Sequence, residues 1–179
     1  MEKQIRIAFT GPECSGKTTL SKWLSNEING QYCQEYAREY LSNNEYQLSD
    51  IDHIGKKQIQ LWEAKKNTSL LIADTEFLVL KIWSEEKFKG CSYFIDNNFN
   101  KQKFDLYFLC KPDIPWVYDD LRESENQRDD LFKKYLSTLK EKDYNFITLS
   151  GNLEQRKKII KKTLISFKQI NEEGEYFQL

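Results

Sequence analysis

The sequence predicts an α/β protein built on a five-stranded parallel sheet with helices on both faces. Five short apolar segments alternate with segments whose apolar residues recur at helical spacing. Strands that alternate with helices are joined by right-handed crossovers, which produce a parallel sheet. The first strand also runs into a glycine-rich turn of the kind that binds phosphate. The chain has 179 residues, enough to bury a core of its own. We therefore expect residues 1–179 to form one domain.

The expected elements follow from turn signals and apolar spacing. The strands are expected at 5–10, 32–34, 69–73, 104–110 and 146–149. The helices are expected from 18 to about 28, and at 36–41, 49–66, 75–87, 93–100, 131–142 and 152–170, with Ser49 as the cap of the third. The stretch 117–130 contains many polar residues, and we expect it to be an irregular lid.

Composition excludes several classes of function. Lys and Arg total 27 against 28 Asp and Glu, which gives a net charge of −1. A dedicated nucleic-acid binder is disfavoured because such proteins carry a strong positive field. The longest aliphatic run, 70–73, is far too short to span a membrane, and no signal peptide is recognisable. Four cysteines without a C-x-x-C pair and a single His argue against a metal hydrolase with several His ligands. We expect a soluble cytoplasmic protein.

The first motif is a Walker A phosphate loop. It reads Gly11-Pro12-Glu13-Cys14-Ser15-Gly16-Lys17-Thr18 and fits G-x-x-x-x-G-K-[ST]. Glycines let the backbone wrap around a phosphate, so that N–H groups and a helix N-terminus point at the anion. Lys17 would neutralise the β- and γ-phosphates, and the Thr18 hydroxyl would ligate Mg²⁺. The loop and the following Thr19 are thus predicted to bind a nucleoside triphosphate with Mg²⁺; the alternative is an ordinary glycine turn.

Other signatures narrow the class of P-loop protein. The chain has no N-K-x-D guanine motif, and the D-x-x-G at 52–55 lies inside a predicted helix. No L-S-G-G-Q signature occurs, and the chain is short for a helicase or motor. A P-loop NTPase of the nucleoside and nucleotide kinase type fits best.

Ligands of parallel α/β sheets bind at the carboxyl ends of the strands. Glu35 follows the second expected strand and could orient or deprotonate a substrate hydroxyl; the alternative is an exposed carboxylate paired with Arg38. Asp74 follows the third and could bind Mg²⁺; the alternative is a helix cap, and Asp74 is also the rival catalytic base. Ser150 and Gly151 follow the fifth and could lie under a donor base, although a plain loop explains them equally well.

Four segments resemble one known family in the same order. They are 11–19 (GPECSGKTT), 35–40 (EYAREY), 72–76 (IADTE) and 113–122 (DIPWVYDDLR). These segments are similar to the kinase domain of NadR-type ribosylnicotinamide kinases. The resemblance implies that ATP phosphorylates the ribose 5′-hydroxyl of nicotinamide riboside to give nicotinamide mononucleotide. Two departures are present: no adenylyltransferase motif accompanies the kinase segments, and Asp120 stands where the family usually has Gly.

A cationic nicotinamide ring favours aromatic faces beside carboxylates. Trp116 is the preferred platform, with core packing as the alternative. The residues expected to contact the acceptor are Glu35, Tyr36, Arg38, Tyr40, Asp74, Asp113, Trp116 and Asp119.

The expected lid supplies cations for the transferring phosphoryl group. Arg122 and Arg128 are expected to contact the donor there, unless they pair with nearby acidic residues in solvent. The catalytic hypothesis joins Lys17, Glu35, Asp74 and Arg122. Two other functions stay open: a kinase of another nucleoside, nucleotide or vitamin alcohol, and a regulatory P-loop ATPase that binds a protein partner.

Overall fold

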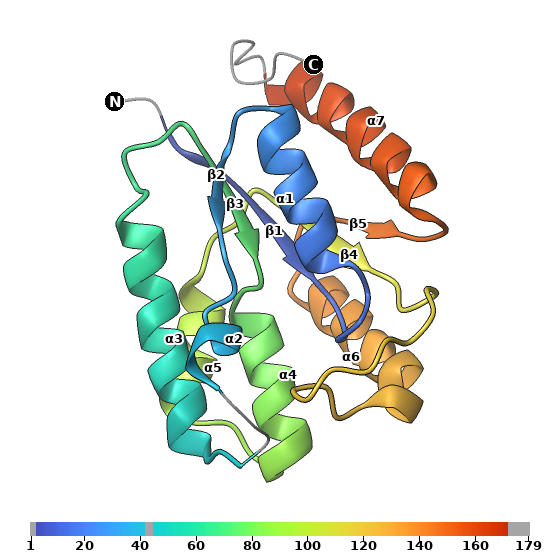
Figure 1. Ribbon diagram of the computed structural model, residues 1–179. Helices are drawn as coiled ribbons and strands as arrows, with labels where there is room; N and C mark the ends of the chain where they lie inside the picture. Colours follow the sequence, from blue (N-terminus) through green and yellow to red (C-terminus); the bar gives the residue numbers. More distant parts are fainter. Residues whose placement is uncertain (1–2, 42–44, 172–179) are drawn as a thin grey trace.

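Five parallel strands form the centre of the protein. The computed structural model describes residues 3–41 and 45–171, with side chains as far as Phe167. The strands are β1 (Ile5–Thr10), β2 (Gln31–Cys33), β3 (Leu70–Asp74), β4 (Leu106–Cys110) and β5 (Phe146–Leu149). They lie in the order β2-β3-β1-β4-β5, and every neighbouring pair is parallel. The predicted sheet is confirmed, and β1 is its middle strand (Figure 1).

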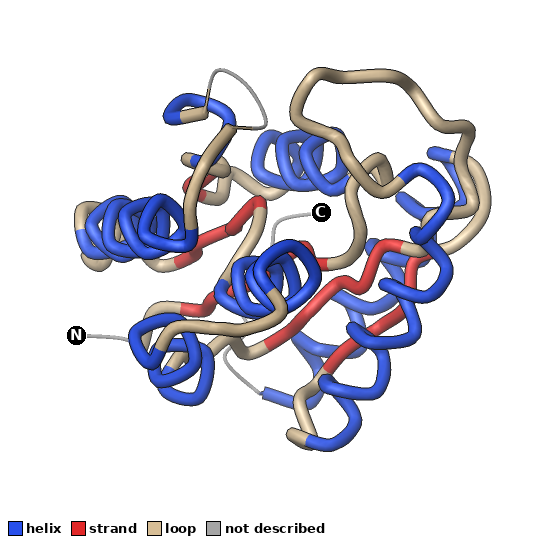
Figure 2. Tube along the Cα trace, turned by 90° about the horizontal axis from the view of Figure 1, so that it is seen from below, coloured by secondary structure: helices blue, strands red, loops and turns tan. Residues whose placement is uncertain are grey.

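Helices cover both faces of this sheet, as predicted (Figures 1 and 2). One face carries α1 (Lys17–Glu27) and α7 (Leu153–Asn171). The other carries α3 (Leu48–Glu63), α4 (Phe77–Phe88), α5 (Tyr93–Lys101) and α6 (Arg128–Glu141). The short helix α2 (Ala37–Tyr40) follows β2, and a single 3₁₀ turn, η1 (Glu125–Gln127), precedes α6.

Alternation along the strands builds two separate cores. Ile7 and Phe9 of β1 pack with α1 and α7, whereas Ala8 between them faces the layer of α3 to α6. In β4, Phe108 and Leu109 divide between the same two cores. Successive side chains of a strand point to opposite faces, so a strand covered on both faces must be apolar at every position. All five positions of β3 and of β4 are buried.

Several helix starts differ from the prediction, and α4 begins at Phe77 rather than 75. Helix α3 begins at Leu48, and its cap is Gln47 rather than Ser49. The Asp50 carboxylate accepts the Gln47 N–H at 2.7 Å, and the Gln47 side chain caps the helix in return. This reciprocal pair satisfies two N–H groups of the helix start. Ser49 lies two residues after Gln47, already inside the helix, and is not the cap. Helix α6 begins at Arg128, so this residue is helical rather than part of an irregular stretch.

Within the described residues, no helix combines the length and apolar character needed to cross a bilayer.

Gly55 of the D-x-x-G run lies inside α3 and serves packing. A Cβ there would lie 3.0 Å from Ile95 and 3.1 Å from Phe77 and Phe94. Because Ile95 and Phe77 are themselves buried, they have little room to move. We therefore expect Gly55→Ala to lower the free energy of unfolding by about 1–2 kcal/mol, despite the better helix propensity of Ala. Chemical denaturation measures this. Gly90→Ala is the control, since a Cβ there meets nothing within 4 Å; equal stability of both variants would contradict the packing role.

Candidate active site

The phosphate loop joins the middle strand to α1. Gly11 has φ +127°, and a Cβ there would lie 2.6 Å from the Cys110 carbonyl oxygen. Gly16, directly before α1, has φ +89°. Both positions therefore require glycine. The Lys17 ammonium donates to the carbonyl oxygens of Gly11 at 2.9 Å and of Pro12 at 2.8 Å. The loop is thus closed around the lysine at the carboxyl edge of the sheet.

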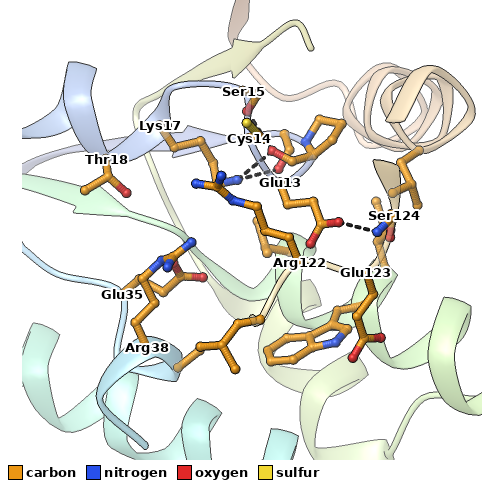
Figure 3. Close-up of a pocket in the computed structure, with 18 of the residues that line it drawn as sticks. Glu13, Cys14, Ser15, Lys17, Thr18, Glu35, Arg38, Arg122, Glu123 and Ser124 are labelled. Atoms are coloured by element: carbon orange, nitrogen blue, oxygen red, sulfur yellow. Dashed lines mark hydrogen bonds and ion pairs between the residues drawn. The ribbon is translucent and has the colours of Figure 1, made fainter. Parts of the chain in front are cut away.

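This loop forms one wall of a cavity of about 210 Å³. The other walls come from Glu35 after β2, from α2, Leu41 and Tyr46, from α4, from the segment before α6, and from α6 itself. The lining residues are Gly11–Thr19, Glu35, Ala37, Arg38, Leu41, Tyr46, Val79, Ile82, Trp83, Glu86, Leu121–Ser124, Leu131 and Tyr135. The structure therefore brings together the predicted residues Lys17, Glu35, Arg38 and Arg122 (Figure 3).

Glu35 is a carboxylate at the cavity wall. Its Oε2 lies 3.5 Å from Nε of Arg38, so the predicted pairing exists alongside the cavity position. Burial raises the pKa of Glu35, the neighbouring Asp74 carboxylate adds to this, and the Lys17 ammonium partly opposes it. A carboxylate with a raised pKa is a stronger proton acceptor, which suits a general base.

Asp74 ends β3 and is 1% exposed. Its Oδ2 accepts the Tyr32 hydroxyl at 3.0 Å, while Oδ1 is buried without a hydrogen-bond partner in the described part of the chain. Asp74 does not cap α4, because Glu76 does so by accepting the Leu78 N–H at 2.6 Å. Asp74 does not line the cavity, but a buried carboxylate oxygen with a lone pair to spare is the donor type that Mg²⁺ prefers.

Thr75, between these carboxylates, has φ +97°, a rare value for a β-branched residue. Its N–H continues the sheet by donating to the Phe9 carbonyl at 3.1 Å. On its other side, Glu76 is fully buried and accepts from Thr10 Oγ1 at 2.7 Å and from Gln102 Nε2 at 2.5 Å. Surroundings that fix both flanks can hold a strained residue, and such residues concentrate at functional sites. The sequence carried no signal of this strain.

The segment before α6 lies against the phosphate loop. The Glu13 carboxylate accepts the Ser124 N–H (Figure 3). The Val117 N–H donates to Cys14 Sγ at 3.3 Å. Arg128 donates to the Cys14 carbonyl at 3.2 Å but does not line the cavity. These contacts hold the predicted lid against the phosphate loop. The sequence motif assigned Glu13 and Cys14 to phosphate binding and did not indicate that they also contact the lid.

Arg122 and Asp119 connect this segment to the cavity. The Arg122 guanidinium extends toward Lys17 (Figure 3). It also donates to the Val117 carbonyl. Asp119 accepts from Arg38 Nη1 at 2.7 Å, and this bond lowers the pKa of Asp119. Asp120 is exposed and its φ is not positive, so its backbone does not require the glycine that the resemblance led us to expect.

Several predicted contact residues lie elsewhere. Tyr40 stacks on His53 at 4.6 Å between ring centroids, next to Tyr36, and its hydroxyl donates to Asp50 at 2.8 Å. The Trp116 ring centroid lies 5.9 Å from the guanidinium of Arg122 and 5.3 Å from that of Arg128.

Asp113, Ser150 and Gly151 also lie outside the cavity lining. Asp113 accepts the Gly151 N–H at 2.8 Å. This places the ends of β4 and β5 beside each other, on the far side of β1 from Glu35.

An aromatic wall was missed by sequence reasoning. Trp83 Nε1 donates to the Tyr46 hydroxyl at 2.6 Å, and the two rings meet edge to face at 5.1 Å. Glu123 accepts from Tyr46 at 3.3 Å. A signal existed in the helical spacing of 79, 82, 83 and 86, all of which line the cavity. Such a stripe is normally interpreted as core, and only the fold shows that it faces a cavity.

A phosphate loop between the middle strand and the first helix of a parallel sheet defines the P-loop NTPase fold. Residues 6–156 match the family model described as an AAA domain, and the chain belongs to this family. The predicted resemblance is also confirmed. Over 152 residues the chain is 30% identical to the trifunctional NAD biosynthesis/regulator protein NadR of Salmonella typhimurium, and 29% to that of Escherichia coli. These matches cover 79% of this chain but only 37% of each relative.

Solved structures share the fold. A crystal structure of NadR protein in complex with NR superposes with a TM-score of 0.67 at 19% identity, covering 84% of this chain and 46% of that one. A structure of deoxyadenosine kinase from M. mycoides superposes with a TM-score of 0.67 at 16% identity, covering 90% of this chain and 100% of that one. A structure of thymidylate kinase from Candida albicans superposes with a TM-score of 0.65 at 16% identity, covering 98% of this chain and 96% of that one. The predicted likeness to nucleoside and nucleotide kinases is thereby confirmed for the fold.

The raised pKa of Glu35 predicts a pH-dependent stability difference. Because the folded pKa lies above the ordinary 4.5, the ionised form is disfavoured in the folded state, so this contribution is present at low pH and is lost as pH rises through the folded value. We expect Glu35→Gln to melt at a higher temperature than wild type at pH 8, with the difference disappearing near pH 4. Thermal melts across that range measure it. The exposed Glu39→Gln serves as the control; a Glu35→Gln variant less stable at pH 8 would contradict the burial effect.

Proposed function

We propose that this protein is an ATP-dependent kinase that phosphorylates the ribose 5′-hydroxyl of nicotinamide riboside to give nicotinamide mononucleotide. One observation carries the proposal: the phosphate loop, a carboxylate with a raised pKa, and aromatic residues beside carboxylates all line the same cavity. The similarity to NadR over 152 residues supports the choice of nucleoside. In this proposal residues 1–179 supply one kinase domain, with 117–130 as its lid.

The donor half consists of the phosphate loop and two cations. Backbone N–H groups of residues 11–18 would bind the β- and γ-phosphates. Lys17 and Arg122, which both line the cavity, would stabilise the charge of a loose transition state. Thr18 at the start of α1 and the unpartnered Oδ1 of Asp74 fit Mg²⁺. That ion would supply charge neutralisation between the phosphates.

The acceptor half centres on Glu35. This carboxylate would accept a hydrogen bond from the ribose hydroxyl, orient its oxygen toward the γ-phosphate, and take the proton as the bond to phosphorus forms. Asp74 is a poorer base, because it lies outside the cavity lining and one of its oxygens accepts from Tyr32. Arg38 holds Glu35 on one side and Asp119 on the other, so it would keep the carboxylate in place as the lid segment packs down.

Trp83 replaces Trp116 as the proposed platform for the cationic ring. Trp83 and Tyr46 line the cavity with Glu86 and Glu123. An indole face beside carboxylates attracts a pyridinium through its quadrupole and through charge. The cations that pair with these two carboxylates, Lys134 and Lys87, come from outside the lining.

The fold is shared with kinases of other nucleosides and nucleotides, so the experiment must establish which acceptor is phosphorylated. ATP consumption would be followed with nicotinamide riboside, the common nucleosides, their monophosphates and vitamin alcohols. We expect nicotinamide riboside to give the highest kcat/KM. A faster reaction with another acceptor would overturn the proposed substrate. Slow hydrolysis unaffected by any acceptor would favour a regulatory ATPase instead.

Two substitutions test the catalytic roles. Lys17→Ala should lower kcat by at least 10³-fold, since the phosphate charge loses its counter-ion. Glu35→Gln should lower kcat by about 10²–10⁴-fold with little change in KM, since a base is lost rather than a binding contact. Steady-state kinetics separate the two constants. Full activity of Lys17→Ala would contradict the donor site, and an effect of Glu35→Gln confined to KM would make Glu35 a binding residue only.

The two tryptophans give a matched pair for the ring site. Trp83→Leu should raise the KM for nicotinamide riboside at least tenfold, because the aromatic face is lost while the apolar wall remains. Trp116→Leu should leave that KM within about twofold and act on ATP, since its ring contacts Arg122 and Arg128. The opposite result would restore Trp116 as the platform.

A further inference from the structure

Arg156 is a buried cation beneath the phosphate loop that the proposed reaction does not yet use. It lies in the first turn of α7 and is 2% exposed. Its Nε donates to the Gly151 carbonyl at 2.8 Å, Nη1 to the Ser15 carbonyl at 2.6 Å, and Nη2 to the Lys111 carbonyl at 2.8 Å. Nη2 also bonds the Asp113 carboxylate. A buried guanidinium must be compensated in this way.

These acceptors come from three separate loops. Ser15 belongs to the phosphate loop after β1, Lys111 and Asp113 follow β4, and Gly151 follows β5. Asp113 completes the arrangement, because its second oxygen accepts the Gly151 N–H at 2.8 Å. Gly151, with φ +87°, is therefore held through both of its backbone polar groups. One guanidinium and one carboxylate thus fix three strand ends as a unit.

The bond to Ser15 bears directly on phosphate binding. In a trans peptide the C=O and the following N–H point in opposite directions. Because Arg156 holds the Ser15 carbonyl on its own side, the Gly16 N–H is directed away from Arg156. Gly16 caps α1 without a side-chain acceptor, and the N–H groups at such a start are free for an anion. A cation on the carbonyl also polarises the peptide and strengthens its N–H as a donor.

We infer that Arg156 is the positioning residue of the donor site, which sets the phosphate-loop peptide 15–16 and locks that loop to the loop at 150–152. The inference rests on the proposed function only in taking a nucleoside triphosphate as the donor. Arg156 touches no reacting atom; it acts through the Ser15–Gly16 peptide, and Asp113 keeps it in place. The sequence analysis predicted that Asp113 contacts the acceptor. Its hydrogen bonds with Arg156 and Gly151 instead connect it to the proposed donor site.

The test measures donor affinity apart from turnover. Binding of a non-hydrolysable ATP analogue and of inorganic triphosphate, each with Mg²⁺, is measured by calorimetry for wild type, Arg156→Gln, Arg156→Lys and Asp113→Asn. We expect Arg156→Gln to weaken both ligands at least tenfold, Arg156→Lys to recover part of that loss, and Asp113→Asn to weaken both at least threefold. The KM for the nucleoside should stay within about twofold. Lys158→Gln, an exposed charge change on the same helix, should leave both affinities unchanged.

Two outcomes would overturn the inference. The first is a folded Arg156→Gln variant with a lower melting temperature but both affinities within twofold of wild type, which would make the role structural. The second is loss of affinity for the ATP analogue alone, which would confine the role to the base end. If Arg156→Gln does not fold, the affinities of Asp113→Asn and Arg156→Lys for the two ligands are used instead. Affinities within twofold of wild type in these variants would overturn the inference. Failure of the nucleoside to be phosphorylated would reject the proposed substrate and leave this binding test intact.

Discussion

The position of β1 between β3 and β4 determines how the rest of the site is arranged. Because both neighbours pair with β1 in parallel, all three strands deliver their following loops to one edge, and the phosphate loop is the middle one. Glu35 and Asp74 then lie to one side, after β2 and β3. Asp113 and Gly151 lie to the other, after β4 and β5. Strand order therefore places these two pairs of residues on opposite sides of the phosphate loop.

Buried charge lies directly beneath this edge on both sides of the phosphate loop. Glu76 fixes the β3 side through Thr10 and Gln102, and Arg156 fixes the β4 side through Ser15 and Asp113. Desolvation makes each of these groups costly, and breaking either set would leave an uncompensated buried charge. Burial also raises the pKa of Glu76. The same arrangement stabilises the strained Thr75, since the chain on either side of it is held. Rigidity is thus concentrated where a phosphoryl group would be transferred.

The fold and the phosphate loop could be predicted because their signals are local. Strand apolarity, helical spacing and the G-x-x-x-x-G-K-T run each lie within a few residues. Strand order depends on long-range pairing, which no local pattern encodes. For this reason the sequence alone did not show that Asp113 lies beside Gly151, across β1 from Glu35. Trp83 was missed for a different reason, because a helical apolar stripe looks the same whether it packs in a core or lines a cavity. The predicted cap of α3 was wrong for a related reason. Gln47 acts as the cap in place of Ser49 through its reciprocal bonds with Asp50, which appear only in the folded chain.

In the proposed function, the donor side and the acceptor side of the cavity would be built from different kinds of group. On the donor side, backbone carbonyls and N–H groups form the contacts, held by Arg156 and by glycines with positive φ. Backbone groups are costly to displace, which suits a triphosphate shared by many P-loop proteins. On the acceptor side, the wall consists of side chains from α4 and from the segment before α6, such as Trp83 and Glu123. Side chains can change without altering the sheet. In the proposed kinase, one donor site would therefore be kept while acceptor specificity would be set by a few positions on α4 and the segment before α6.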